Sequence, residues 1–176
     1  MTTTCYHGRR LMINGGTMTP VEVLAHDAPA GTRWPLVHFV KHSPAGFGWG
    51  YYGSAPVELA RCLLIDALGS VALCPMCNGH QWLTWPALDG DDDPRPYDPG
   101  RDGEADLNDL VSPCYCGDGI RPLPYHPLAA EMIRNLPDHW RISRADLLTW
   151  LVGHFPEQVP DWLSRVVSIT DVELPR

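Results

Sequence analysis

The sequence CPMCNGH at residues 74–80 and the sequence CYCGDG at residues 114–119 say most about how this chain folds. Each stretch holds a close pair of cysteines followed by glycine, which lets the backbone turn tightly around an ion. Structural zinc takes four ligands at the corners of a tetrahedron, and two such turns, termed knuckles, can supply them. We therefore predict a zinc ion bound by four cysteines: Cys74, Cys77, Cys114 and Cys116.

Other assignments of these cysteines stay open. The spacing of the second pair, with one intervening residue, makes a tighter and rarer knuckle than the first pair. His80 and His126 are the reserve ligands if one cysteine does not reach the ion. A pair of disulfides or four unrelated thiols are the alternatives to metal binding.

The compartment inferred from the sequence favours metal over disulfides. The first ten residues, MTTTCYHGRR, lack the apolar segment of a secretory signal. No stretch approaches the roughly 18 to 20 apolar residues of a membrane span. We therefore expect a cytoplasmic protein without membrane contact, and cytoplasmic thiols stay reduced.

Composition and charge exclude one class of function. The chain has 176 residues, of which 13 are basic and 21 acidic, so its net charge is −8. A sequence-independent grip on nucleic-acid phosphates needs a basic surface, which this composition disfavours. Eight of the acidic residues lie in residues 89–106, which we predict to be a solvated loop. A calcium loop is the alternative there, since Asp89, Asp91 and Asp93 alternate, although the glycine and the distal glutamate of an EF-hand are missing at their positions.

The hydrophobic pattern predicts an α+β fold: a small antiparallel sheet packed by helices, with an inserted loop-rich zinc-knuckle subdomain. The core domain is expected at residues 1–69 and 128–176, and the insert at 70–127. Strand character is found at residues 3–7, 21–24, 34–40 and 81–85. Helices are expected at residues 54–68, 128–136, 145–155 and 161–167.

The helix at 54–68 carries the clearest pattern. Its apolar residues form two adjacent stripes, and Gly69 is the expected C-terminal cap. Cys62 is predicted to be a small core residue, and Asp66 is predicted to face solvent. The helix near the C-terminus is expected to open with a capping box at Ser143.

The sequence GFGWGYYG at residues 46–53 is rich in glycine and aromatic residues and runs into the start of a helix. Backbone N–H groups at such a place accept anions, and the aromatic rings can stack on a flat ligand. The alternative is that the glycines permit tight turns and the aromatics fill the core. The candidate ligand loop comprises His42, Ser43, Gly48, Trp49, Tyr51, Gly53 and Ser54. His38 and His42 lie four residues apart, and we interpret them as structural histidines more readily than as a metal pair.

Three segments resemble a small domain family of unknown function that is common in bacteriophages and other mobile elements. They are YHGRR at residues 6–10, KHSPAGFGWGYYGSAPVELARCLLIDALG at 41–69 and AAEMIRNLPDHWRISRADLLTWL at 129–151. The chain departs from the family pattern at Tyr52 and Ala55, where the family has glycines, and in the cysteine segment, which resembles an insertion. The resemblance implies a phage or prophage origin and an accessory role, and it implies no activity.

Three classes of function follow. The first is a non-enzymatic accessory protein that binds a host or phage protein, with an anti-defence role as one option and Trp82, Trp85 and Tyr115 as candidate interface residues. The second is a nucleic-acid-binding zinc-ribbon-like protein, which the acidity disfavours. The third is a small nucleotide-binding protein or enzyme that uses the glycine-rich loop. No nucleophile, base and orienting group appear together in the sequence.

Overall fold

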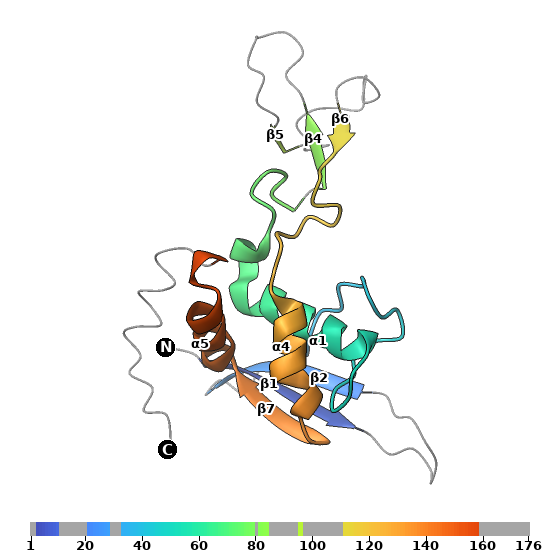
Figure 1. Ribbon diagram of the computed structural model, residues 1–176, viewed down its shortest axis with the longest axis vertical. Helices are drawn as coiled ribbons and strands as arrows, with labels where there is room; N and C mark the ends of the chain where they lie inside the picture. The colour runs from blue at the N-terminus through green and yellow to red at the C-terminus, as the bar shows by residue number, and fades with distance from the viewer. Residues whose placement is uncertain are drawn as a thin grey trace. The chain divides into compact units, whose positions relative to one another are not determined.

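The computed structural model describes residues 3–10, 21–28, 33–79, 81–84, 95–96 and 111–158 (Figure 1). The chain divides into two compact units. The first consists of Met1–Leu68 and Leu123–Arg176, and the second of Gly69–Pro122. Strands and helices occur together, so the predicted α+β class is confirmed. Whether the second unit folds as an independent domain stays a prediction.

A four-stranded antiparallel sheet forms one layer of the first unit. Its order is β3-β2-β1-β7. The strands are β1 (Thr3–Arg10), β2 (Val21–Ala28), β3 (Arg33–Pro35) and β7 (His139–Ser143). The strands predicted at residues 3–7 and 21–24 are thus confirmed. Strand β7 was not predicted, although Trp140 and Ile142 alternate with exposed neighbours as the period of a half-buried strand requires.

The strand predicted at 34–40 is wrong beyond Pro35. The chain leaves the sheet there because side chains of α1 form hydrogen bonds with its backbone. The amide of Lys41 donates a hydrogen bond to Glu58, and Arg61 donates one to the carbonyl oxygen of Phe39. These bonds to side chains replace the ladder bonds of a strand.

Three helices lie over one face of this sheet (Figure 1). They are α1 (Ser54–Leu68), α4 (Tyr125–Glu131) and α5 (Arg144–His154). The capping box predicted at Ser143 is present, with Asp146 as its partner. The helix predicted at 128–136 begins earlier and is divided, since a 3-10 helix follows at Ile133–Asn135. The helix predicted at 161–167 lies outside the described residues. No helix in the described ranges is long and apolar enough to cross a bilayer.

Helix α1 is the centre of the first unit. Both predicted apolar stripes are buried, and Cys62 is a core residue as predicted. The prediction for Asp66 is wrong: it is partly buried and accepts a hydrogen bond of 2.8 Å from the hydroxyl of Tyr6. Burial and the nearby Asp66 carboxylate raise the pKa of Tyr6, so its hydroxyl keeps its proton and donates.

The glycine-rich loop is fastened to the sheet through Trp49. The Trp49 indole is fully buried, donates to the carbonyl oxygen of Pro137 and meets the Trp140 ring edge-on, with ring centres 5.6 Å apart. Arg10 donates to the carbonyl oxygen of Trp49 and pairs with Asp138. The loop is therefore held by aromatic packing and by one arginine of β1.

Trp140 also explains the glycine of YHGRR. A Cβ atom added at Gly8 would lie 2.2 Å from the Trp140 indole, so only glycine leaves room for that ring.

The second unit contains a three-stranded antiparallel sheet of order β5-β4-β6. Its strands are β4 (Trp82–Thr84), β5 (Arg95–Pro96) and β6 (Val111–Pro113), and a 3-10 helix at Gly69–Ala72 precedes them. The strand predicted at 81–85 is found at Trp82–Thr84. The acidic loop predicted at 89–106 lies outside the described residues except for β5.

The side chain of Glu58 is fully buried and anchors the segment after β3. It accepts hydrogen bonds from the backbone amides of Lys41 and His42 and contacts His38 Nε2 at 3.2 Å. Burial by itself raises the pKa of Glu58, but these hydrogen bonds outweigh it and hold the pKa below its ordinary value. The carboxylate is thus the form that the fold stabilises.

We predict that Glu58→Gln lowers the free energy of unfolding by about 2–3 kcal/mol at neutral pH, because an amide nitrogen cannot accept these bonds. A lowered pKa gives stability that is present above the unfolded-state pKa of about 4.3 and is lost as pH falls through the folded-state pKa. The difference between the two proteins should therefore narrow in acid. Denaturant titrations at several pH values measure it, with the exposed Glu157→Gln as control. Equal stability at neutral pH would contradict the role of Glu58.

Candidate metal centre

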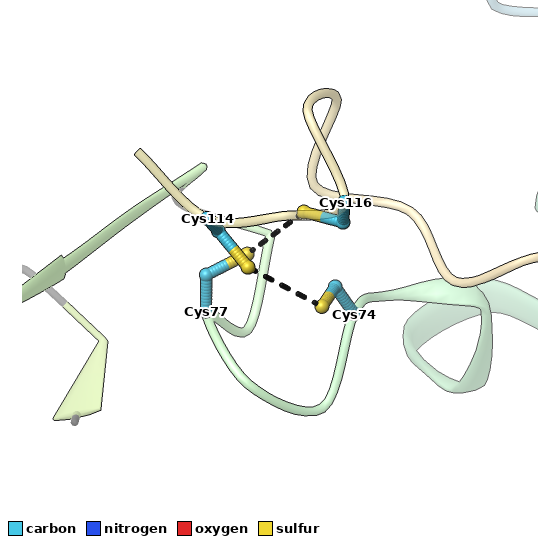
Figure 2. Close-up of side chains that lie close together, drawn as sticks. All are labelled: Cys74, Cys77, Cys114 and Cys116. Atoms are coloured by element: carbon cyan, nitrogen blue, oxygen red, sulfur yellow. Dashed lines mark hydrogen bonds between the residues drawn. The ribbon is translucent and has the colours of Figure 1, made fainter. Parts of the chain in front are cut away.

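The structure brings the four predicted cysteines together in the second unit. Their sulfur atoms all lie within 4.8 Å of one another. Cys74 and Cys77 come from the turn before β4, and Cys114 and Cys116 come from the segment after β6. Figure 2 shows the side chains of the two segments pointing toward one another. The Sγ–Sγ distance is 3.8 Å for Cys74–Cys114 and 3.5 Å for Cys77–Cys116. The arrangement can hold a metal ion.

These distances fit tetrahedral coordination. Zinc–sulfur bonds of about 2.3 Å give a tetrahedron whose edges are about 3.8 Å. A disulfide needs sulfur atoms about 2.0 Å apart, which is far shorter than either distance. None of the six cysteines forms a disulfide in the structure.

Backbone hydrogen bonds shape both knuckles. In each, an amide bonds back to the first cysteine's carbonyl oxygen: Asn78 to Cys74 at 2.8 Å and Gly117 to Cys114 at 3.0 Å. Positive φ angles turn the chain, at 47° for Asn78 and 74° for Gly117. Asn78 and Gly117 thus allow the tight turns after the cysteines that the sequence predicted.

Two further hydrogen bonds join one knuckle to the other. The backbone amide of Cys114 donates to the carbonyl oxygen of Gln81, and the backbone amide of Cys74 donates to the carbonyl oxygen of Gly119, both at 2.8 Å. The backbones come very close here, because a Cβ atom added at Gly119 would lie 2.6 Å from the carbonyl oxygen of Gly79. The contact between the knuckles therefore fixes the spacing of the cysteine pairs.

The cluster is sheltered from water. Cys74, Cys77 and Cys114 are buried, and Leu83 of β4 packs against them with Cys116 at the edge. Burial, then hydrogen bonds to Cys114 and Cys77, raises the pKa of Cys116 to about 12. Burial also acts to raise the pKa of Cys74, but the amides of Cys77 and Met76 outweigh it and lower that pKa. Four thiols this close cannot all ionise without a cation, which a divalent metal supplies.

The structure also describes some of the other predicted ligand and interface residues. Tyr115 is 99% exposed between Cys114 and Cys116. His126 belongs to the first unit, where its ring contacts those of His42 and Tyr125. The metal cluster found among the described residues contains cysteines alone. His80, Trp85 and the side chain of Trp82 lie outside the described residues.

The residues of the candidate ligand loop do not form one surface. Ser43, Gly48 and Trp49 are buried. His42 contacts the hydroxyl of Tyr125 through Nε2 at 3.3 Å. Burial lowers the pKa of His42, which favours its neutral form.

The rest of the loop is exposed. Ser54 begins α1, and Tyr51 and Gly53 line a cavity. Sequence reasoning missed the other side of that cavity, which is formed by α4 and Arg134. Arg134 belongs to no periodic pattern in the sequence and is 82 residues from Tyr52 in the chain, so only the fold shows that it lies beside the loop.

Comparison with known proteins supports part of the sequence resemblance. Residues 6–80 match the model of the family of unknown function DUF6166. The resemblance to a family of unknown function is therefore confirmed for this part of the chain, which is less than half of it and includes Cys74 and Cys77. No curated protein and no solved structure matches the chain.

We predict that Gly119→Ala weakens metal binding by at least about tenfold, because the added Cβ forces the knuckles apart and changes the cysteine spacing. Gly117→Ala is the matched control. Its φ of 74° imposes similar backbone strain, but nothing lies within 4 Å of the added Cβ. Competition with a chromophoric chelator measures both affinities. Equal affinities for the two variants would show that the close approach at Gly119 is unimportant.

Proposed function

We propose that the four cysteines bind one structural zinc ion. The observation that carries this proposal is the meeting of four sulfur atoms from two separate segments at the spacing of a tetrahedron. Soft thiolate ligands in that geometry select zinc or iron. A site with four protein ligands has no open position for substrate, so its role is structural. The ion would join the two knuckles of a unit in which few other described residues are apolar and buried.

We further propose that the knuckles present residues to a protein partner. Tyr115 lies between two ligands of one knuckle and is 99% exposed, and Met76 lies between the two ligands of the other and is 49% exposed. Tyrosine and methionine are enriched in protein interfaces. Coordination of the flanking cysteines would hold both side chains outward at little entropic cost.

Charge favours a protein partner over nucleic acid. The net charge of −8 repels phosphates and attracts a basic protein surface. The described residues of the second unit supply two arginines, Arg95 and Arg121, which is a small electrostatic footprint for a nucleic-acid-binding module. Nucleic-acid binding is therefore the second candidate.

The origin and compartment belong to the same proposal. An accessory protein of a phage or another mobile element, acting in the host cytoplasm without catalysis, is consistent with the sequence resemblance and with reduced thiols. Genes for packaging or for inhibitors of host defence beside this gene would support that origin, and a stable position among housekeeping genes would contradict it.

We predict about one zinc ion per chain in protein purified without a metal-binding tag, measured by elemental analysis. Cys77→Ser should lose the ion and unfold the second unit, because binding energy on the order of 10 kcal/mol supports such modules. Cys62→Ala removes a buried thiol of α1 and should keep the ion. If elemental analysis finds iron in place of zinc, the site is an iron site and the zinc assignment is wrong. A metal-free protein that remains folded would contradict it.

We predict that Tyr115→Ala abolishes recovery of a stoichiometric protein partner from host lysate, since an interface anchor is worth at least about 2 kcal/mol. Tyr52→Ala is the control, because Tyr52 is exposed but belongs to the first unit. Reconstitution with the purified partner should reproduce both results. Sub-micromolar binding to DNA or RNA that weakens steeply with salt would favour nucleic acid instead.

A further inference from the structure

The first unit contains a cavity of about 210 Å³ that has no part in the metal centre. One side is formed by the end of the glycine-rich loop and the first turn of α1, and the other by α4 and the 3-10 helix after it. Its lining combines aromatic, small apolar and basic residues, among them Tyr51, Tyr52, Pro56, His126, Ala130 and Arg134.

The charge of this cavity is opposite to that of the protein. None of the described residues that line it is acidic, although the chain carries a net charge of −8. Arg134 supplies its formal positive charge. A cavity of this character in an acidic protein selects anions from solution.

Arg134 is held in position and keeps donors for a ligand. Its guanidinium carbon lies 4.9 Å from the centre of the Tyr52 ring, and Nη1 donates to the Tyr52 hydroxyl. Among the described residues no carboxylate pairs with Arg134. Stacking on an aromatic ring orients a guanidinium without using its remaining N–H groups.

The shape of the cavity indicates the rest of the ligand. Tyr51 and Tyr52 are exposed by 47% and 75%, and because Arg134 already covers one face of the Tyr52 ring, Tyr51 offers the ring that is free of a stacked cation. Pro56 and Ala130 are small apolar residues, which leave space for a flat group between the two sides. The volume lies below the roughly 300–1,000 Å³ of sites for drug-sized molecules. It suits one ring and one anionic group.

We propose that this cavity binds a small anion built on a single planar ring, of the aryl phosphate or aryl carboxylate class. The ring stacks on a tyrosine of the loop, and the anionic group accepts hydrogen bonds from Arg134. This site is independent of the zinc centre and of any protein partner. A planar group and an anionic group also occur together in a 5′-mononucleotide, which is larger because a ribose separates its phosphate from its base.

Calorimetric titration of the full chain tests the proposal with four probes: phenyl phosphate, inorganic phosphate, benzyl alcohol and adenosine 5′-monophosphate. Phenyl phosphate should bind with a dissociation constant of about 1 mM or lower, and at least about tenfold more tightly than inorganic phosphate or benzyl alcohol. If the natural ligand is a free aryl anion, adenosine 5′-monophosphate should bind more weakly than phenyl phosphate. Tighter binding of the nucleotide would assign the site to mononucleotides within the same chemistry.

Substitutions of single residues test whether phenyl phosphate binds in this cavity. Arg134→Gln should weaken phenyl phosphate binding by at least about tenfold, the effect of one charge-assisted hydrogen bond. The control Arg33→Gln removes an exposed arginine of β3 outside the lining and should bind as the original protein does. Ala130→Trp should fill the cavity and abolish binding, with circular dichroism as the check of folding. The proposal would be overturned if benzyl alcohol bound as tightly as phenyl phosphate, or if Arg33→Gln weakened binding as much as Arg134→Gln. It would also be overturned if phenyl phosphate did not bind at about 10 mM.

Discussion

Helix α1 is buried around most of its circumference, so the polar groups that it carries must find partners inside the protein. This constraint organises the first unit. Glu58 takes its partners from the segment after β3, and Arg61 donates to the carbonyl oxygen of Phe39 in the same segment. Asp66 accepts from Tyr6 in β1. The helix thus fixes a segment without regular secondary structure and links it to the sheet by hydrogen bonds as well as by apolar packing.

The second unit has a different source of order. Its short strands bury little apolar surface among the described residues, and Leu83 is the apolar side chain packed against the cysteines. Two knuckles with glycines in contact bring four sulfur atoms into one cluster. A metal ion in that cluster would provide the free energy that a small core does not supply, because metal binding to a site formed on folding contributes directly to stability.

The two proposed sites use different chemistry and belong to different units. The cysteine cluster is sheltered from water, and in our proposal it holds residues such as Tyr115 in a fixed arrangement. The cavity beside Tyr52 is open, carries positive charge and is formed by side chains that are already oriented by one another. Under the two proposals, one unit binds a macromolecule and the other binds a small anion.

The sequence by itself determined the elements that depend on local chemistry. The cysteine pairs, the glycines after them, the apolar stripes of α1 and the capping box at Ser143 are patterns within about fifteen residues, and the structure contains all of them. Only the tertiary structure decided the end of β3, the strand β7, the partner of Asp66 and the cavity beside Arg134. Each of these depends on groups far apart in the chain: Tyr6 and Asp66 are 60 residues apart, and Tyr52 and Arg134 are 82 apart. Local periodicity carries no information on such pairs, because burial and hydrogen bonding are set by whichever segments the folded backbone places side by side.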